Sequence, residues 1–361
     1  MNKTWHWRAL LALALATGLA ACERHTAPSA AYPSVEPRVE TAPVESRDDA
    51  ADDPAIWFNR QAPAASWVLG TDKRAGLYVY DLNGAVVDYR PAGRINNVDL
   101  RNVTVADQQR VLVGATERSR KALVFFFLEP STGKLTPAGR QPLELADPYG
   151  FCLIRRPAAQ GAATLYAFVT GKSGAFRQFQ IQFEPTKPVL TQVRRGQIGS
   201  VAEGCVGDDR SGMLYVAEET VGIWRYAADP ATGNERTAFA RLADVPLVAD
   251  IEGLALIPGT AGKPNEGWLL ASSQGDSSFA VFSLDSRYRG SFRLRKNPAA
   301  GIDAVSETDG IAVLASNALP GWPGGLFVAQ DDRNTPQGAQ NFKYAAWADI
   351  LEALNLQPST D

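Results

Sequence analysis

The stretch VAEGCVGDD, residues 201–209, places three carboxylates around a segment whose composition is otherwise that of a buried strand. Carboxylates repel one another, so this crowding needs a chemical reason. The arrangement recurs, because six places in the chain carry a polar residue, then a small residue or turn former, then a short apolar run. The polar residues are Asp53, Asn97, Tyr149, Glu203, Glu252 and Asp309, at spacings of 44, 52, 54, 49 and 57 residues. Their oxygen atoms could hold a metal ion if the fold brings them together.

A second series of polar residues lies at the end of the apolar run that follows each of these places. Its members are Lys73 with Arg74, Arg118, Lys172, Glu219, Gln274 and Asp331. Cationic side chains beside metal ligands suit a polyanion, because phosphate binds both metal ions and Lys or Arg.

Histidine is absent from the part of the sequence that is expected to fold. The chain has two histidines, His6 and His25, and both lie near the N-terminus. This excludes a Ser-His-Asp triad, a phosphohistidine enzyme and a histidine-ligated zinc or iron site. Catalysis would have to use carboxylates, Lys, Arg, Tyr or a bound hard metal.

The elements that must position these residues are short strands. Runs such as LYVYDLNG at 77–84 and GIWRYAADPATG at 222–233 are typical of strands and hairpin turns. Four short strands in each repeat of about 50 residues predict one blade of a β-propeller. Six repeats predict an all-β, six-bladed propeller with four-stranded antiparallel blades around a central channel. A large β-sandwich or barrel is the alternative, but it does not predict six copies of one series.

In such a blade, the first strand starts and the second strand ends at the same end, because neighbouring strands are antiparallel. All the polar residues above should therefore converge on one mouth of the channel. There the acids would form one cluster beside a cationic sector, and such a cluster is stable only with bound cations. Oxygen ligands without histidine favour Ca²⁺ over Mg²⁺ or Mn²⁺. For any single acid, the alternative is that it only caps a turn.

The N-terminus has the features of an export signal. Lys3 and Arg8 precede a short apolar stretch, residues 9–16, which is too brief to span a bilayer comfortably. The sequence LAAC that ends at Cys22 is similar to a bacterial lipoprotein cleavage site, which implies a lipid on the sulfur of Cys22. An ordinary signal peptide that happens to hold a cysteine is the alternative.

These features divide the chain into a lipoprotein signal peptide at 1–21, a flexible tether at 22–37 and the propeller at 38–361. We expect an exported protein, either an outer-membrane or cell-surface lipoprotein or a periplasmic or secreted one. Its contact with the membrane would be the lipid anchor alone, and we expect a monomer. The net charge of −3 argues against nucleic acid as a partner.

Several longer motifs point to one family. They are ETAPV, AADDPAIW, TDKRAGLYVYDLNG, NNVDLR, YGFCL, FVTGKSGAFRQF, AEGCVGDD, LYVAEE, DIEGLAL, LLASSQGDSSFAVF, ETDGI, LFVAQDD and QNFK. With these motifs the chain resembles the β-propeller phytases, which are calcium-dependent hydrolases of inositol hexakisphosphate (phytate). The resemblance runs from about Glu40 to Tyr344, and the motifs together are far more specific than any one of them.

The resemblance implies several calcium ions beside a phosphate-binding pocket. The calcium ligands of the catalytic centre would be Glu40, Asp52, Glu203, Glu219, Glu252, Asp303 and Asp309, with Asp53 on a more structural calcium. Tyr149 would touch both metal and substrate. The substrate-binding residues would be Lys73, Arg74, Arg118, Lys172 and Gln274. The residues with catalytic roles would be Lys73, Arg118, Tyr149, Lys172 and Glu219.

The implied reaction is the removal of phosphate from phytate or calcium phytate by attack of a calcium-activated water, without a covalent phosphoenzyme. A non-catalytic, calcium-stabilised propeller that binds an anionic ligand or a partner protein is the alternative. A calcium-dependent lactonase propeller is a third reading, which the lack of histidine disfavours.

Cys152 and Cys205 occupy near-equivalent places, just inside the first strands of two adjacent blades. Such strands are close near the propeller axis, and exported proteins form disulfides. We therefore expect a disulfide between them, the alternative being two small buried apolar residues.

Overall fold

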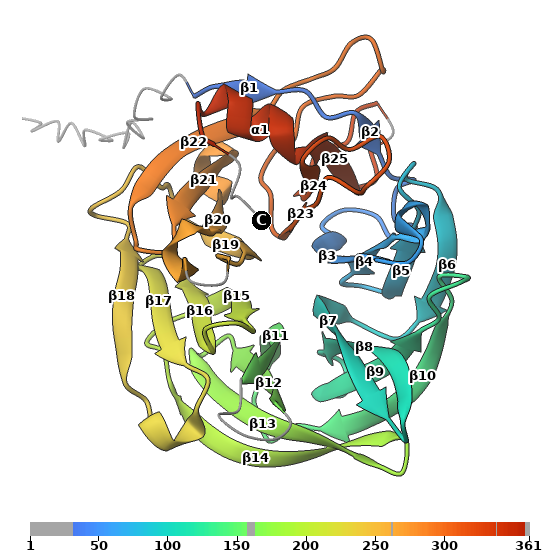
Figure 1. Ribbon diagram of the computed structural model, residues 1–361, viewed down its shortest axis with the longest axis vertical. Helices are drawn as coiled ribbons and strands as arrows, with labels where there is room; N and C mark the ends of the chain where they lie inside the picture. The colour runs from blue at the N-terminus through green and yellow to red at the C-terminus, as the bar shows by residue number, and fades with distance from the viewer. Residues whose placement is uncertain (1–31, 157–162, 261–262, 337, 358–361) are drawn as a thin grey trace, which may run out of the picture. The chain divides into compact units, whose positions relative to one another are not determined.

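The computed structural model describes residues 32–156, 163–260, 263–336 and 338–357. These residues form six sheets that are arranged as blades around a central channel (Figure 1). The predicted six-bladed propeller is therefore confirmed. The expected signal peptide and Cys22 lie outside the described residues. Within the described part of the chain, no helix is long and apolar enough to cross a membrane.

Each blade is built from four strands, ordered from the channel outward. The innermost strands are β3 Ala51–Trp57, β7 Ile95–Val105, β11 Pro148–Arg156, β15 Ala202–Asp208, β19 Ile251–Ile257 and β23 Ile311–Ala315. The second strands are β4 Trp67–Asp72, β8 Gln108–Glu117, β12 Thr164–Gly171, β16 Met213–Glu218, β20 Trp268–Ser273 and β24 Gly325–Asp331. The third strands are β5 Gly76–Tyr80, β9 Ala122–Leu128, β13 Ala175–Glu184, β17 Gly222–Ala227, β21 Ser278–Ser283 and β25 Asn341–Ala346. The outer strands are β6 Val86–Pro91, β10 Leu135–Pro142, β14 Lys187–Gln197, β18 Arg236–Arg241, β22 Tyr288–Leu294 and β2 Val39–Glu40.

The helical elements are short. Within the described residues one α-helix, α1 Trp347–Ala353, packs Trp347, Ile350 and Leu351 into the core between the fifth and sixth blades. The 3₁₀ turns in the described residues are Pro63–Ala65, Pro230–Thr232, Pro264–Glu266 and Gln274–Asp276.

The ring is closed by the N-terminal residues, an arrangement that the repeat pattern did not predict. Strand β2 is the outer strand of the sixth blade and pairs antiparallel with β25, with Glu40 opposite Lys343. Strand β1, Ser34–Val35, adds a parallel fifth strand to the edge of the fifth blade. The propeller therefore begins before residue 38, its predicted start after the tether at 22–37, because Ser34–Val35 already belongs to a sheet.

The core consists of separate apolar layers between neighbouring blades. Leu69 and Val79 of the first blade, for example, meet Val113 and Phe126 of the second, and the sixth blade meets the first in the same way. Because both faces of each sheet are covered by its neighbours, the strands carry near-continuous apolar runs. This packing fixes the blades and holds the inner strands side by side around the channel (Figure 1).

Candidate metal and phosphate site

The residues that the sequence singled out lie at an irregularity that five inner strands share. The ladder between first and second strand shifts register at Asp52–Asp53, Asn96–Asn97, Tyr149–Gly150, Glu203–Gly204 and Glu252–Gly253. A β-bulge releases its residues from regular pairing and turns their side chains in a new direction. The bulge is thus the local device that presents a polar side chain at the channel end of five blades.

The glycines of these motifs let neighbouring blades approach one another. A Cβ on Gly204 would lie 1.8 Å from the main-chain oxygen of Glu252, and one on Gly150 would lie 1.9 Å from that of Glu203. No side chain fits at such distances, so glycine is required at both positions. The close approach brings ligands of adjacent blades together, which explains why a polar residue is followed by glycine.

Hydroxyl groups on the second strands connect three of these bulges to the next blade. The Oγ1 atom of Thr170 accepts a hydrogen bond from the amide of Gly150 at 2.9 Å and donates one to the main-chain oxygen of Ala202 at 2.6 Å. Thr116 and Ser272 make the same pair of contacts in their own blades. These residues were not predicted, although each lies two positions before a charged or amide residue of the second series.

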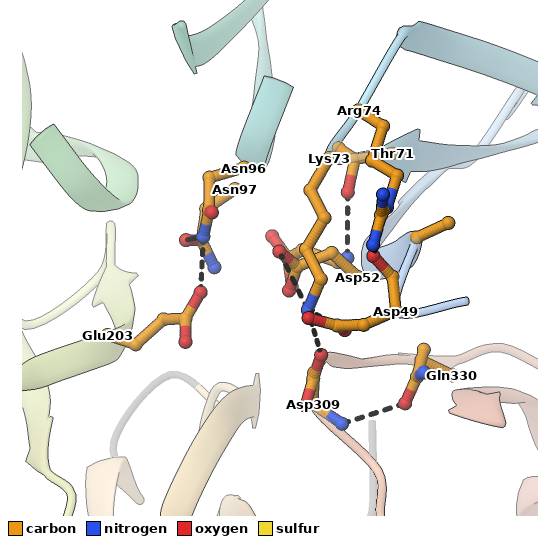
Figure 2. A network of polar contacts seen from close by, with 12 residues as sticks. Asp49, Asp52, Thr71, Lys73, Arg74, Asn96, Asn97, Glu203, Asp309 and Gln330 are labelled. Atoms are coloured by element: carbon orange, nitrogen blue, oxygen red, sulfur yellow. Dashed lines mark hydrogen bonds and ion pairs between the residues drawn. The ribbon is translucent and has the colours of Figure 1, made fainter. Parts of the chain in front are cut away.

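Glu203, Glu219 and Glu252 form a compact group that we call the acidic group. One carboxylate oxygen from each lies within 4.8 Å of the others. Glu203 Oε1 also accepts a hydrogen bond from Asn96 Nδ2 (Figure 2). Among the described residues, buried Glu219 Oε1, Glu252 Oε2 and the nearby Asp52 Oδ2 have no hydrogen-bond partner. Converging oxygens without donors match the needs of a hard divalent cation, so these residues fit Ca²⁺.

The electrostatics of the acidic group point to the same conclusion. Burial, together with the charges of Glu203 and Asp250, raises the pKa of Glu219 to about 7. Burial and the neighbouring Glu203 raise the pKa of Glu252 well above its ordinary value. Without cations these carboxyls therefore hold protons more readily than exposed acids do. A divalent cation would compete with those protons.

Lys73 joins the acidic side of the channel mouth to its cationic side. Its Nζ atom lies 2.7 Å from Asp309 Oδ2, 2.5 Å from Asp49 Oδ1 and 3.9 Å from Asp52 Oδ2 (Figure 2). Burial alone would lower the pKa of Lys73, but Asp52 and Asp309 raise it above its ordinary value. Asp309, whose pKa rises to about 6 through burial and the charge of Glu203, also accepts a hydrogen bond of 2.7 Å from Gln274 Nε2.

A polar cavity of about 430 Å³ opens beside the acids. It is lined by Asp49, Lys73, Arg74, Arg94, Asn96, Arg118, Tyr149 and Lys172. We call its five cationic side chains the cationic pocket. The ring of Tyr149 is the floor on which two of them rest, with Lys172 Nζ 4.4 Å and the guanidinium carbon of Arg118 5.5 Å from its centroid. Arg94 was not predicted, and its signal was its place two residues before the bulge at Asn96.

Three acids named in the sequence analysis contact one buried lysine, Lys343. Asp331, the last residue of β24, is fully buried and contacts Lys343, which is itself fully buried. In the other blades the site residue is the one after the second strand, so the prediction of Asp331 at the mouth was wrong by one position, and Asp332 takes that place. Glu40 and Asp303, expected as calcium ligands, also meet at Lys343, with Asp303 Oδ1 2.5 Å and Glu40 Oε2 3.8 Å from its Nζ.

The charge of Lys343 explains why these three acids gather around it. A lysine with no exposure is stable only when carboxylates surround it. Burial opposes ionisation of Asp303, yet hydrogen bonds from Lys343 and Thr335 lower the pKa of Asp303. The structure thus gives Glu40 and Asp303 an ammonium partner, and their binding of calcium stays a prediction.

Asp53 faces a different part of the channel from Asp52. It lines a cavity of about 380 Å³ together with Asn97 and Arg101, and its Oδ2 atom accepts a hydrogen bond of 3.0 Å from the amide of Val98. Asp53 therefore ties the first blade to the second. Its assignment to a separate, structural calcium also stays a prediction.

A disulfide joins Cys152 of β11 to Cys205 of β15 in the structure. The two Cα atoms lie 5.7 Å apart, across a sequence separation of 53 residues. The bridge lies two residues beyond Glu203 and three beyond Tyr149. It therefore links the third and fourth blades directly beside the acidic group.

Comparison with known proteins identifies the family. The family model described as Phytase matches residues 3–361. The chain belongs to the phytase family. A curated relative, the 3-phytase of Bacillus subtilis (strain 168), is 36% identical to this phytase-family chain over 364 residues, covering 96% of it and 94% of the relative.

Two solved structures with low sequence identity show a likeness in fold to this phytase-family chain. A calcium-binding protein, regucalcin, from Agrobacterium tumefaciens str. C58 superposes with a TM-score of 0.52 and 13% identity, covering 87% of this chain and 97% of its own. An auxiliary nutrient binding protein from Bacteroides thetaiotaomicron VPI-5482 superposes with a TM-score of 0.51 and 9% identity, covering 86% of this chain and 76% of its own.

Proposed function

We propose that this protein removes phosphate from phytate and that it needs calcium to do so. The observation that carries the proposal is the meeting of two opposite environments at one mouth of the channel. The acidic group offers buried oxygens without donors, and the cationic pocket lies directly beside it. A substrate with several phosphates can bind both at once, and membership of the phytase family supports phytate as that substrate.

Glu203, Glu219, Glu252, Asp52 and Asp309 would hold the calcium ions. Bound calcium would supply Lewis-acid polarisation of a phosphate oxygen and would lower the pKa of a water molecule at the site. Tyr149 would face both partners, since its ring lies beside Glu203 and beneath Lys172. The acids would thus concentrate bound calcium ions beside the phosphorus atom that is attacked.

The chain's own cations would bind and orient the phosphates. Lys73, Arg118 and Lys172 reach the cavity from three successive blades, so they can contact separate oxygens of one phosphate or two neighbouring phosphates. Their charge would stabilise the negative charge that develops during in-line transfer. We expect no covalent phosphoenzyme, because both cysteines of the propeller form a disulfide and the histidines lie at positions 6 and 25.

The test is phosphate release from phytate by the purified protein, first with calcium and then with excess chelator. Release that depends on calcium supports both parts of the proposal. Release that is unaffected by the chelator would retain the phytase and remove calcium from its mechanism. A folded protein that releases no phosphate under either condition would favour the alternative, a propeller that binds an anionic ligand without chemistry.

We also propose that the protein is exported and anchored by a lipid on Cys22. The support is the sequence LAAC at 19–22 behind a short apolar stretch. Labelled fatty acid should enter the wild-type protein in a bacterial host and should not enter the Cys22→Ser variant. Equal labelling of the two would reject the anchor.

A further inference from the structure

Asp49 and Asp147 are exposed acidic side chains that pair with cations of the cationic pocket. Asp49 Oδ1 lies 2.5 Å from Lys73 Nζ, and Asp147 Oδ1 lies 3.1 Å from Arg118 Nη2. Lys172 and Arg94 have no carboxylate partner within the described residues. The pocket therefore combines three cations that have a carboxylate partner, Lys73, Arg118 and also Arg74 with Asp48 Oδ2 at 3.9 Å, with two that are open to an anion.

The two pairs are asymmetric in exposure. The side chains of Asp49 and Asp147 are 69% and 50% exposed, whereas those of Lys73 and Arg118 are only 16% and 14% exposed. Each acid can turn into solvent at little cost, because a partly exposed ion pair contributes little. The cations cannot follow, since Tyr149 and Asn96 hold Arg118 and Asp309 holds Lys73. The acids are thus the exchangeable partners.

The main chain keeps both acids in place while their side chains are free to exchange. The main-chain oxygen of Asp147 accepts a hydrogen bond of 3.2 Å from the amide of Lys172. The main-chain oxygen of Asp49 accepts one of 2.9 Å from Arg74 Nε. A carboxylate tethered in this way competes for its cation at a high effective concentration.

We propose that Asp49 and Asp147 are resident counter-ions of the cationic pocket, which pair with Lys73 and Arg118 between turnovers and weaken the binding of inorganic phosphate. They act through Lys73 and Arg118, and they are displaced when phosphates of the substrate arrive and restored when phosphate leaves. A substrate with several phosphates tolerates this competition, because its first contact with Lys172 or Arg94 raises the effective concentration of its other phosphates. A single phosphate has no such advantage. This role rests on the proposed phytase function.

The experiment measures the affinity for orthophosphate in Asp147→Asn and Asp49→Asn. Asparagine suits both sites, and it accepts the positive φ of 46° at Asp147. Glu144→Gln is the matched control, because it removes the same charge from the same loop and its side chain makes no ion pair within the described residues. Asp147→Glu, which keeps the carboxylate, should bind orthophosphate with an affinity close to that of wild type.

Affinity is measured in two ways, as the competitive inhibition constant of orthophosphate during phytate hydrolysis and as calorimetric binding of orthophosphate with chelator present. Each Asn variant should bind orthophosphate about two- to fivefold more tightly than wild type, the range expected for loss of one partly exposed ion pair. Added salt should reduce the difference. The Glu144→Gln control should stay close to wild type.

Unchanged or weaker orthophosphate binding in both Asn variants would overturn the proposal, as would an equal gain in Glu144→Gln. The calorimetric measurement needs no turnover. If wild type released no phosphate from phytate while Asp147→Asn still bound orthophosphate more tightly, the phytase function would fail and the counter-ion role would remain.

Discussion

Removing the disulfide between Cys152 and Cys205 should weaken the fold more than the site. The bridge closes a loop across 53 residues, and chain-entropy arithmetic for such a loop gives about 4 kcal/mol of stabilisation at 25 °C. That is a large fraction of the roughly 5–15 kcal/mol that separates folded from unfolded domains. The perturbation is the double variant Cys152→Ala and Cys205→Ala.

The assay is unfolding in urea, with and without calcium. With a slope of about 3 kcal/mol per molar urea, a loss of 4 kcal/mol should lower the midpoint by about 1 M. Wild type treated with a reductant should show the same shift, which controls for the loss of the buried sulfur of Cys152. Counting thiols in the denatured protein before and after reduction verifies the state of the bridge.

Activity at 25 °C should change less than twofold, because other contacts position Glu203. Its carboxylate accepts a hydrogen bond from Asn96, and its main-chain oxygen packs against Gly150 of the previous blade. A midpoint shift below about 0.3 M would refute the entropic argument, since it corresponds to less than about 1 kcal/mol. Loss of activity in a variant that is still folded would refute the positional argument and would assign that role to the disulfide.

Three further predictions test the charges. Glu219→Gln should abolish calcium-dependent phosphate release while circular dichroism shows an unchanged fold, and normal activity would remove Glu219 from the metal site. In the presence of chelator, stability to urea should fall as the pH rises from about 4.5 to about 7. The reason is the raised pKa of Glu219, which makes the folded protein hold more protons than the unfolded chain in that pH window. Calcium should flatten this pH dependence, and a stability that rises with pH would contradict the prediction. Lys343→Met should lower the free energy of unfolding by about 3–5 kcal/mol, because it leaves the buried carboxylate of Asp331 without a cation. Urea unfolding measures this loss, and a loss below about 1 kcal/mol would show that Asp331 finds another partner.

The propeller and the general position of the site could be predicted because they follow from periodicity. Six copies of one series give six blades, and antiparallel pairing places strand starts and strand ends at one mouth. The convergence of Lys73, Arg118 and Lys172 beside Glu203 follows from these two facts alone. It depends only on the order of the strands, which the repeat pattern contains.

Details that depend on strand length or distant pairing could not be predicted. The assignment of Asp331 failed because β24 extends one residue further than the repeat pattern indicated. Glu40 and Asp303 meet at Lys343 because β2 closes the sixth blade, and a pairing across some 300 residues leaves no periodic signal. Arg94 and Asp147 lie in connections between strands, where the repeat pattern is weakest.

Lys73 explains how one channel mouth can hold an acidic group and an anion-binding pocket. Without cations, its ammonium lies among Asp49, Asp52 and Asp309, where it offsets part of their repulsion. A divalent cation held by Asp52 and Asp309 would take over that task, and Lys73 would be free to contact phosphate. The raised pKa values of Glu219 and Asp309 indicate that protons share the same task. Binding of calcium would therefore release protons and prepare the cationic pocket at the same time, so metal and substrate should strengthen each other's binding.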